Sequence, residues 1–284
     1  MPQYPFWKIT PSGNPTILLR AEDIPTEYRA AVARAVMDDQ HIGGEQVGYI
    51  RLSGIPRMDM MGGEFCLNAT RAFASVLDAL GLLEREGKDS RGFVEVSGSE
   101  GLVEVCVTHA DHALPFAEAC LHFDTLPEPV DMADGLRLVR IPGIAHIVQS
   151  GTPAPYNVEQ GQLPDFCSHQ RAELGLENED AVGHLWLSSD KSQIDSGTVR
   201  LVLAPVVWVR ETKTLCFESA CGSGTLACAL AEHAKSGATR FDIVQPSGTA
   251  LSVRIEKAEK GWDVWVGGPS RITASGVTDL TGIL

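Results

Sequence analysis

The chain has 284 residues, of which 44% are hydrophobic and 21% charged, a composition typical of globular proteins. This length suits two domains of moderate size. Its 37 acidic residues outnumber 23 basic ones, and the formal net charge is -14. Phosphate backbones and anionic lipids repel such a chain, which argues against nucleic-acid and membrane-surface functions. No apolar run is long enough to span a bilayer.

The seven cysteines are an odd number, and they do not recur at the spacing of a disulfide scaffold. The first residues also lack the basic start and apolar core of an export signal. We therefore expect a cytoplasmic protein with reduced thiols. Cys167 lies beside His169, but no second ligand pair follows at zinc-finger spacing, so no metal is expected. Packing roles are expected for Cys106, Cys120, Cys216 and Cys228.

Short runs that are β-branched or alternate in polarity predict strands along the whole chain. They lie at 16–19, 47–52, 92–96, 102–107, 136–141, 199–209 and 262–267. Apolar spacing or Ala/Leu-rich composition predicts helices at 26–37, 68–83 and 225–235. Strands outnumber helices, and each half has one long helix. We therefore predict an α+β fold in which each sheet wraps a single helix. The most linker-like point is Pro127-Glu128-Pro129.

One internal correspondence links the two halves. Residues 62–68 (GGEFCLN) run into the first long helix, and residues 218–225 (ESACGSGT) run into the second. Each half thus presents a cysteine, Cys66 or Cys221, at the start of its main helix. Two similar halves facing each other would place these thiols across one cleft.

This arrangement suits proton transfer at the Cα of an amino acid. A helix N-terminus stabilises a thiolate and also binds anions, here the substrate carboxylate. The carboxylate would be held more tightly as negative charge develops in the transition state. Moving a proton between the two faces of Cα requires one thiolate and one thiol. Glycines at 222 and 224 allow close approach of the backbone, and Asn68 and Thr225 offer polar groups in the first turns.

At these residues the chain resembles the diaminopimelate epimerase family of pyridoxal-independent racemases, over nearly its whole length. The family segment F-x-K-x-x-x-x-G-N is similar to residues 6–14, and G-x-G-x-D-Q is similar to the stretch around Gln46. The first catalytic motif, C-G-N-G-x-R, is similar to residues 66–71 (CLNATR). The second, A-C-G-[ST]-G, matches residues 220–224 without a change, and G-P-[AS] resembles residues 268–270.

The resemblance implies two similar halves, each a barrel-like antiparallel sheet around one central helix. Residues 1–127 with about 272–284 would form the half that carries Cys66, and 128–271 the half that carries Cys221. The two cysteines would be the catalytic pair, without a cofactor or metal. The implied contacts to the amino-acid end of the substrate are Asn14, Gln46, Leu67, Asn68, Gly222, Ser223, Gly224 and Thr225. A homodimer is a further family expectation.

The departures from the family concern the other end of the substrate. Arg57 replaces an Asn, Ile144 stands in a G-N-P-H-like motif that keeps His146, and a N-V-G-F-like strand ends in His184. Thr212 and Lys213 replace a Glu-Arg pair. A charged substrate end left without partners costs roughly 2–5 kcal/mol, so diaminopimelate fits poorly. These six residues are the candidates for the side-chain pocket of another amino acid. Known relatives of this kind include histidine racemases that serve opine-type metallophore synthesis. His146 has a second interpretation, as a residue that satisfies a loop hydrogen bond.

Three alternatives stay open at this point. The chain is a true diaminopimelate epimerase, or it belongs to the phenazine-biosynthesis or proline-racemase branch of the superfamily. The third alternative is not an enzyme: a non-catalytic amino-acid-binding protein, or a thiol sensor in which Cys66 and Cys221 pair on oxidation. A sensor based on oxidation of this pair gives no reason for the presence of Asn14 and Gln46 at the positions of the family motifs.

Overall fold

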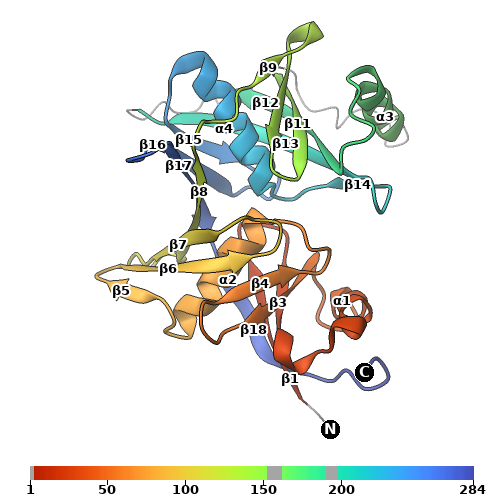
Figure 1. Cartoon of the computed structure of the whole chain (residues 1–284), viewed down its shortest axis with the longest axis vertical. Coiled ribbons are helices and arrows are strands. Elements are labelled where there is room, and N and C mark those ends of the chain that lie inside the picture. The colour runs from red at the N-terminus through yellow and green to blue at the C-terminus, as the bar shows by residue number, and fades with distance from the viewer. Residues whose placement is uncertain (1–2, 152–161, 190–196) are drawn as a thin grey trace. The chain divides into compact units, whose positions relative to one another are not determined.

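A computed structural model describes residues 3–151, 162–189 and 197–284 (Figure 1). These residues form a mixed α/β fold with a large β-sheet. The chain divides into two compact units, Met1–Leu121 with Gly267–Leu284, and His122–Val266. It passes from the first unit to the second within β8 (Phe116–Phe123) and returns within β17 (Trp262–Pro269). Among the described residues, no helix has the length and apolar character needed to cross a membrane.

The first unit combines a sheet with two α-helices. Its strands are β1 (Tyr4–Thr10), β2 (Thr16–Arg20), β3 (Gln46–Arg51), β4 (Arg57–Met60), β5 (Glu84–Glu86), β6 (Asp89–Val96), β7 (Leu102–Thr108) and β18 (Arg271–Thr278). The helices are α1 (Arg29–Met37) and α2 (Leu67–Ala79), with short 3-10 turns at Ala21–Asp23 and Thr26–Tyr28. Antiparallel pairs are β1 with β2 and β18, β3 with β4, β6 with β5 and β7, and β7 with β8.

Two pairs in this sheet are parallel, β2 with β3 and β4 with β6. The expectation of a purely antiparallel sheet is therefore wrong. Parallel neighbours need a crossover connection, and the chain supplies one each time. Helix α1 lies between β2 and β3 in the sequence, and α2 lies between β4 and β6.

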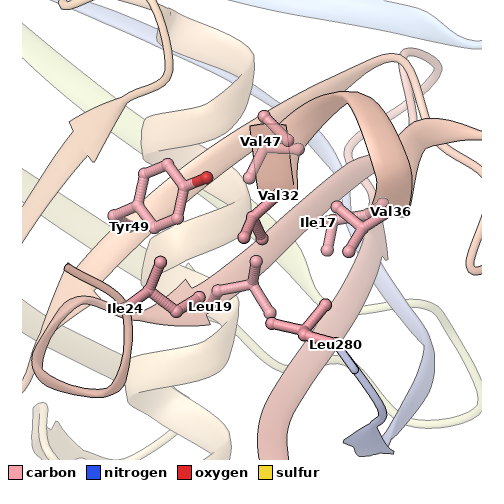
Figure 2. Packing of buried hydrophobic residues seen from close by; sticks show 9 residues of the cluster. Ile17, Leu19, Ile24, Val32, Val36, Val47, Tyr49 and Leu280 are labelled. Atoms are coloured by element: carbon pink, nitrogen blue, oxygen red, sulfur yellow. The ribbon is translucent and has the colours of Figure 1, made fainter. Parts of the chain in front are cut away.

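The two helices of this unit pack differently. In α2, every residue from Leu67 to Leu77 is buried, and the helix contacts β1, β2, β4, β7 and β18. Helix α1 buries only one face, with Val32 and Val36 against β2 and β3 (Figure 2). Because side chains alternate along a strand, Ile17 and Leu19 of β2 meet α1 while Leu18 points to the other face. Helix α2 is therefore the central helix of the unit.

The second unit contains β9 (Val130–Asp131), β10 (Leu136–Ile141), β11 (Ile144–Ser150), β12 (Ala181–Ser189), β13 (Val199–Val209), β14 (Thr214–Phe217), β15 (Arg240–Val244) and β16 (Ala250–Lys257). Its helices are α3 (Leu163–Glu173) and α4 (Gly222–Ser236), and a 3-10 turn covers Ala133–Gly135. Pairs β9–β10, β10–β11, β12–β13, β13–β14 and β15–β16 are antiparallel. Pairs β11–β12 and β13–β15 are parallel, and α3 and α4 lie in their respective connections.

Helix α4 is the buried helix of this unit. It contacts β10, β11, β12 and β16, and all of its residues from Gly224 to Ala231 are buried. The helix ends at Gly237, whose left-handed backbone (φ +72°) lets its N–H bond to the carbonyl of His233. Helix α3 instead packs Leu163 and Cys167 against Trp186 of β12.

All seven predicted strand segments lie within observed strands, except that residue 52 falls one position past the end of β3. The predicted helix at 26–37 begins with a 3-10 turn and becomes α-helical at Arg29. The predicted helix at 68–83 ends at Ala79, because Gly81 adopts a left-handed conformation (φ +68°). Helix α4 begins three residues earlier than predicted, at Gly222. Helix α3 and several strands, including β1 and β11, were not predicted.

Candidate active site

Cys66 is the N-cap residue of α2. Its backbone is extended, and its Sγ accepts a hydrogen bond from the Ala69 amide at 3.5 Å. The Cys66 carbonyl accepts from both the amide (2.9 Å) and the hydroxyl (2.8 Å) of Thr70. The sulfur thus takes the place that a Ser, Thr or Asp oxygen usually fills at a helix start. There it lies at the positive end of the helix dipole, the position that stabilises a thiolate.

Cys221 caps α4 in the same way. Its Sγ accepts from the Gly224 amide at 3.3 Å, and its carbonyl accepts from the Thr225 amide (2.9 Å) and hydroxyl (2.7 Å). Both cysteines therefore have the same local geometry, each within its own unit. Thr70 is the counterpart of Thr225, although no function was predicted for it from the sequence.

Gln46 contacts the first thiol directly. The Cys66 Sγ donates to the Gln46 Oε1 at 3.1 Å, and Gln46 begins β3 opposite Thr16 of β2. Asn14 lies two residues before Thr16, in the loop between β1 and β2, with a left-handed backbone (φ +47°) and a buried side chain. The Thr16 hydroxyl donates to the Asn14 carbonyl at 3.1 Å. In the first unit, Gln46 is thus tied to the thiol and Asn14 to the neighbouring strand.

The remaining predicted contacts occupy the first turns of the two helices. Leu67 and Asn68 follow Cys66, and both are buried. Gly222, Ser223 and Gly224 follow Cys221, and the Ser223 Oγ lies 3.6 Å from the Cys221 Sγ. A Cβ at position 224 would lie 2.9 Å from a Leu185 methyl and 3.1 Å from the Cys221 sulfur. Glycine at 224 therefore lets the sulfur and β12 approach the helix start closely.

Gln245 supports the second cysteine and was missed by the sequence analysis. It directly follows β15 and is 2% exposed. Its Oε1 accepts from the Cys221 amide at 3.0 Å, and its Nε2 donates to the Thr225 hydroxyl at 3.0 Å and the Ile243 carbonyl at 2.9 Å. No local motif connects it to Cys221, because the two residues are 24 positions apart and meet only in the folded unit.

The other cysteines differ from this pair. Burial raises the pKa of Cys167 to about 11 and that of Cys228 well above the usual value, and it also raises the pKa of Cys106. These thiols stay protonated at neutral pH, and Cys120 is likewise buried. The prediction of packing is confirmed for Cys106, Cys120 and Cys228. It is wrong for Cys216, which is exposed on the short strand β14.

His146 is a completely buried residue of β11. Its ring covers Gly183 of β12, where an added Cβ would lie 2.0 Å from the His146 Nδ1. Neither ring nitrogen has a hydrogen-bond partner among the described residues, so the alternative of a loop hydrogen bond is wrong. Burial, with a smaller effect of His184, lowers the pKa of His146 to about 3. The imidazole is therefore neutral at physiological pH.

His184 lies on the other face of the sheet. Its Nδ1 donates to the Gln170 Oε1 of α3 at 2.8 Å, and its ring stacks on Trp186. The next residue, Leu185, contacts Gly224 of α4 instead, as strand alternation requires. Burial and then Arg171 lower the pKa of His184 to about 3. The two histidines are thus neighbours in the sheet but face different helices.

The other four side-chain candidates lie at the edges of elements. Arg57 begins β4 in the first unit and forms ion pairs with Asp59 (2.7 Å) and Glu95 (3.4 Å). Ile144 begins β11 and is half-buried. Thr212 and Lys213 are exposed in the turn between β13 and β14. In the parts of the chain that the structure describes, no three His, Cys, Asp or Glu side chains form a metal-binding group.

Solved structures with this fold define its class. A phenazine biosynthesis protein of the PhzF family from Enterococcus faecalis has a TM-score of 0.60 and 14% identity, and covers 98% of this chain and 100% of its own. A probable proline racemase from Agrobacterium radiobacter K84 has a TM-score of 0.63 and 12% identity, with 98% and 94% covered. The fold is therefore that of the PhzF and proline racemase-like proteins.

Sequence comparison defines the family within this class. The model of the histidine racemase CntK N-terminal domain matches residues 3–278, and the chain belongs to this family. A histidine racemase from Fusobacterium nucleatum subsp. nucleatum is 30% identical over 277 residues, 95% of this chain and 94% of the relative. One from Staphylococcus aureus is 26% identical over 285 residues, with 95% and 96% covered. The chain is accordingly an amino-acid racemase, an isomerase, as the sequence predicted.

Proposed function

We propose that this racemase interconverts L- and D-histidine without a cofactor, using Cys66 and Cys221 as its two proton-transferring groups. The observation that carries the proposal is the shared cap geometry. Each cysteine sulfur accepts a hydrogen bond from a backbone amide in the first turn, and each lies at the positive end of a buried helix. Such a position favours a thiolate, and the neighbouring N–H groups suit a carboxylate.

In the proposed reaction, the thiolate of one cysteine takes the proton from Cα while the thiol of the other delivers a proton to the opposite face. The exchange leaves the roles of the two cysteines reversed, and the reverse reaction runs from that state. The carboxylate gains negative charge as Cα is deprotonated, and the helix N-termini stabilise that charge most in the transition state.

Gln46 suits a sulfur that alternates between two forms. Its Oε1 accepts from the Cys66 thiol at 3.1 Å. An amide that turns over presents its NH2 group instead, which donates to a thiolate. The same side chain can therefore contact Cys66 before and after proton transfer.

Histidine is the proposed substrate for two reasons. The family and the curated relatives carry the name histidine racemase. In addition, the residues that would hold the charged distal end of diaminopimelate are replaced, with Thr212 and Lys213 in place of a Glu-Arg pair. We propose further that the D-histidine serves opine-type metallophore synthesis.

The two units also support a proposal of internal repetition. Each contains an antiparallel pair, a parallel crossover through an outer helix, a second antiparallel pair, and a parallel crossover through a buried helix. We propose that they are two similar halves, each wrapped around one helix. The boundaries at 127 and 271, the cytoplasmic location and the homodimer stay predictions.

The test incubates the protein with L-histidine in D2O, without pyridoxal phosphate, and follows Cα exchange by NMR together with chiral chromatography. We expect deuterium incorporation and formation of D-histidine. A panel of other L-amino acids, including diaminopimelate, is run in parallel. If only diaminopimelate exchanges its Cα proton, then diaminopimelate and not histidine is the substrate. No exchange across the panel would contradict the racemisation mechanism and favour a binding protein or thiol sensor.

A further inference from the structure

The most unusual buried charge in the first unit is the guanidinium of Arg71. Its side chain is 0% exposed and lies on α2, five residues after Cys66. It donates hydrogen bonds to the Ala117 carbonyl (2.9 Å), the Ser12 Oγ (3.2 Å), the Asn68 Oδ1 (3.3 Å), the Pro11 carbonyl (3.4 Å) and the Pro269 carbonyl (3.5 Å). A charge buried this completely is costly unless it is well partnered, so its position calls for an explanation.

Three of the five partners of Arg71, namely Pro11, Ser12 and Asn68, belong to the segments that carry the predicted site. Pro11 and Ser12 lie in the loop that contains Asn14. The Ser12 hydroxyl also donates to the Pro269 carbonyl at 2.8 Å, which joins this loop to the end of β17. Arg71 therefore fastens the Asn14 loop to the helix that begins at Cys66.

Arg71 also fixes the orientation of Asn68. A guanidinium can only donate hydrogen bonds, so the end of the Asn68 amide that faces Arg71 must be its oxygen. The NH2 group then lies at the other end of the amide. That is the end that can donate to a carboxylate.

The charge of Arg71 acts on the thiol as well. Burial lowers the pKa of Arg71 to about 10, while attraction to Glu118 and to the Cys66 thiolate works in the opposite direction. An attraction between two groups is mutual, so the guanidinium would stabilise Cys66, at the start of the same helix, when its thiol loses the proton. Glu118 lies on β8 and competes for the same charge.

We propose that Arg71 is a positioning residue for racemisation, which holds the Asn14 loop and Asn68 in place for the substrate carboxylate and favours the thiolate form of Cys66. The naming of Cys66 as a base rests on the proposed function. The electrostatic part can be tested without turnover. The position that corresponds in α4, five residues after Cys221, is the apolar Leu226, so this device belongs to the Cys66 helix alone.

The experiment measures iodoacetamide labelling of Cys66 against pH by peptide mass spectrometry. It uses a Cys221→Ser background, so that titration of the second thiol does not contribute. In Arg71→Gln we expect the midpoint to rise by about one pH unit, which makes labelling at pH 7 about tenfold slower. Arg71→Lys keeps the charge, and its midpoint should stay within about 0.3 pH unit. The matched control is Arg29→Gln, because Arg29 also holds two carbonyls of the first unit, those of Ala21 and Ile24.

Racemisation by Arg71→Lys, with Cys221 intact, tests the positioning part. A lysine cannot reproduce the fork of donors, so we expect KM to rise about tenfold with a smaller change in kcat. A folded Arg71→Gln protein with the wild-type midpoint would overturn the electrostatic part, and so would a shift of the same size in Arg29→Gln. If Arg71→Gln does not fold, as judged by circular dichroism, Arg71→Lys decides: unchanged KM and kcat overturn the proposal. A wild-type protein that racemises no amino acid contradicts the proposed function, while the labelling still tests Arg71.

Discussion

The two buried helices begin in the same way but in different surroundings. Cys66 and Cys221 both cap their helices with sulfur, and each is followed four residues later by a threonine that bonds back to its carbonyl. Around Cys66 the structure places a buried guanidinium and an amide that meets the sulfur. Around Cys221, the side-chain amide of Gln245 accepts a hydrogen bond from the backbone N–H of Cys221. Leu185 packs against the first turn of α4. Identical local geometry is thus combined with two chemically different environments.

The cap of each helix and the residues around its sulfur therefore have separate roles. A cap depends on residues within one turn and can be repeated in each half. The surroundings include side chains from other strands, such as Gln46 and Leu185, and can differ between the two units. Four predictions test this comparison, in order of decreasing effect.

Replacement of either capping cysteine has the largest expected effect. In Cys66→Ser and in Cys221→Ser, racemisation should fall by roughly 10²–10⁴-fold, because a serine hydroxyl is a far weaker base at neutral pH. Serine is a good N-cap, so thermal stability should change little. Cys228→Ser, at a buried cysteine of α4, is the control and should retain activity. Full activity in either capping variant would show that only one thiol is needed.

Low pH should lower the unfolding free energy through the second unit. That unit buries two neutral histidines, whereas the first unit buries a charged arginine. The pKa values of His146 and His184 are lowered to about 3 from an ordinary value of 6.5. The unfolded chain therefore binds more protons below pH 6.5, and stability is lost as pH falls from 6.5 toward 3. The slope is up to about 1.4 kcal/mol per pH unit for each histidine.

Urea unfolding at pH 5 and pH 7 measures this loss. Replacing His184 with Gln should remove about half of the pH-dependent part, because glutamine does not titrate. His169→Gln is the matched control, since His169 is exposed on α3. An equal pH dependence in wild type and His184→Gln would contradict the expectation.

The two glutamines should differ in what they support. Gln245→Ala leaves a buried amide of Cys221 without its acceptor and should lower the unfolding free energy by about 1–3 kcal/mol. Gln46→Ala removes a contact to the thiol and should reduce kcat/KM with a smaller loss of stability. Chemical unfolding and racemisation assays on both variants check this. The comparison fails if the two variants lose stability and activity in equal proportion.

The smallest expected effect concerns the paired threonines. Thr70→Val and Thr225→Val each remove one hydroxyl bond to a capping carbonyl, worth about 0.5–1.5 kcal/mol. Thr225→Val should cost more, because its hydroxyl also accepts from Gln245. Thermal unfolding of the two variants side by side measures the difference. A larger loss of stability in Thr70→Val than in Thr225→Val would contradict the idea that the hydrogen bonds around the start of α4 are the stronger set.

Much of the local structure could be predicted from the chain. The seven strand segments have β-like composition over five or more residues in most cases, and strands form there. The cysteines at the helix starts could be recognised because a cap involves residues only three or four positions apart. The parallel pairs could not be recognised, since pairing depends on how the crossovers through α1, α2, α3 and α4 pack. Helix α3 has few apolar residues and so left little periodic signal.

The two capped helices could thus be inferred from the chain alone, because capping involves only neighbouring residues. The residues around each sulfur are known only from the folded structure. Gln245 bonds to Cys221 from 24 residues away, and Arg71 bonds to Pro269, which lies 198 residues further along the chain. Likewise, His146 and His184 both lie in strands, but their surroundings depend on the packing of the sheet. His184 contacts Gln170 of α3, whereas His146 covers Gly183 on the other face. Burial and long-range hydrogen bonds depend on the whole fold, and no local pattern of residues encodes them.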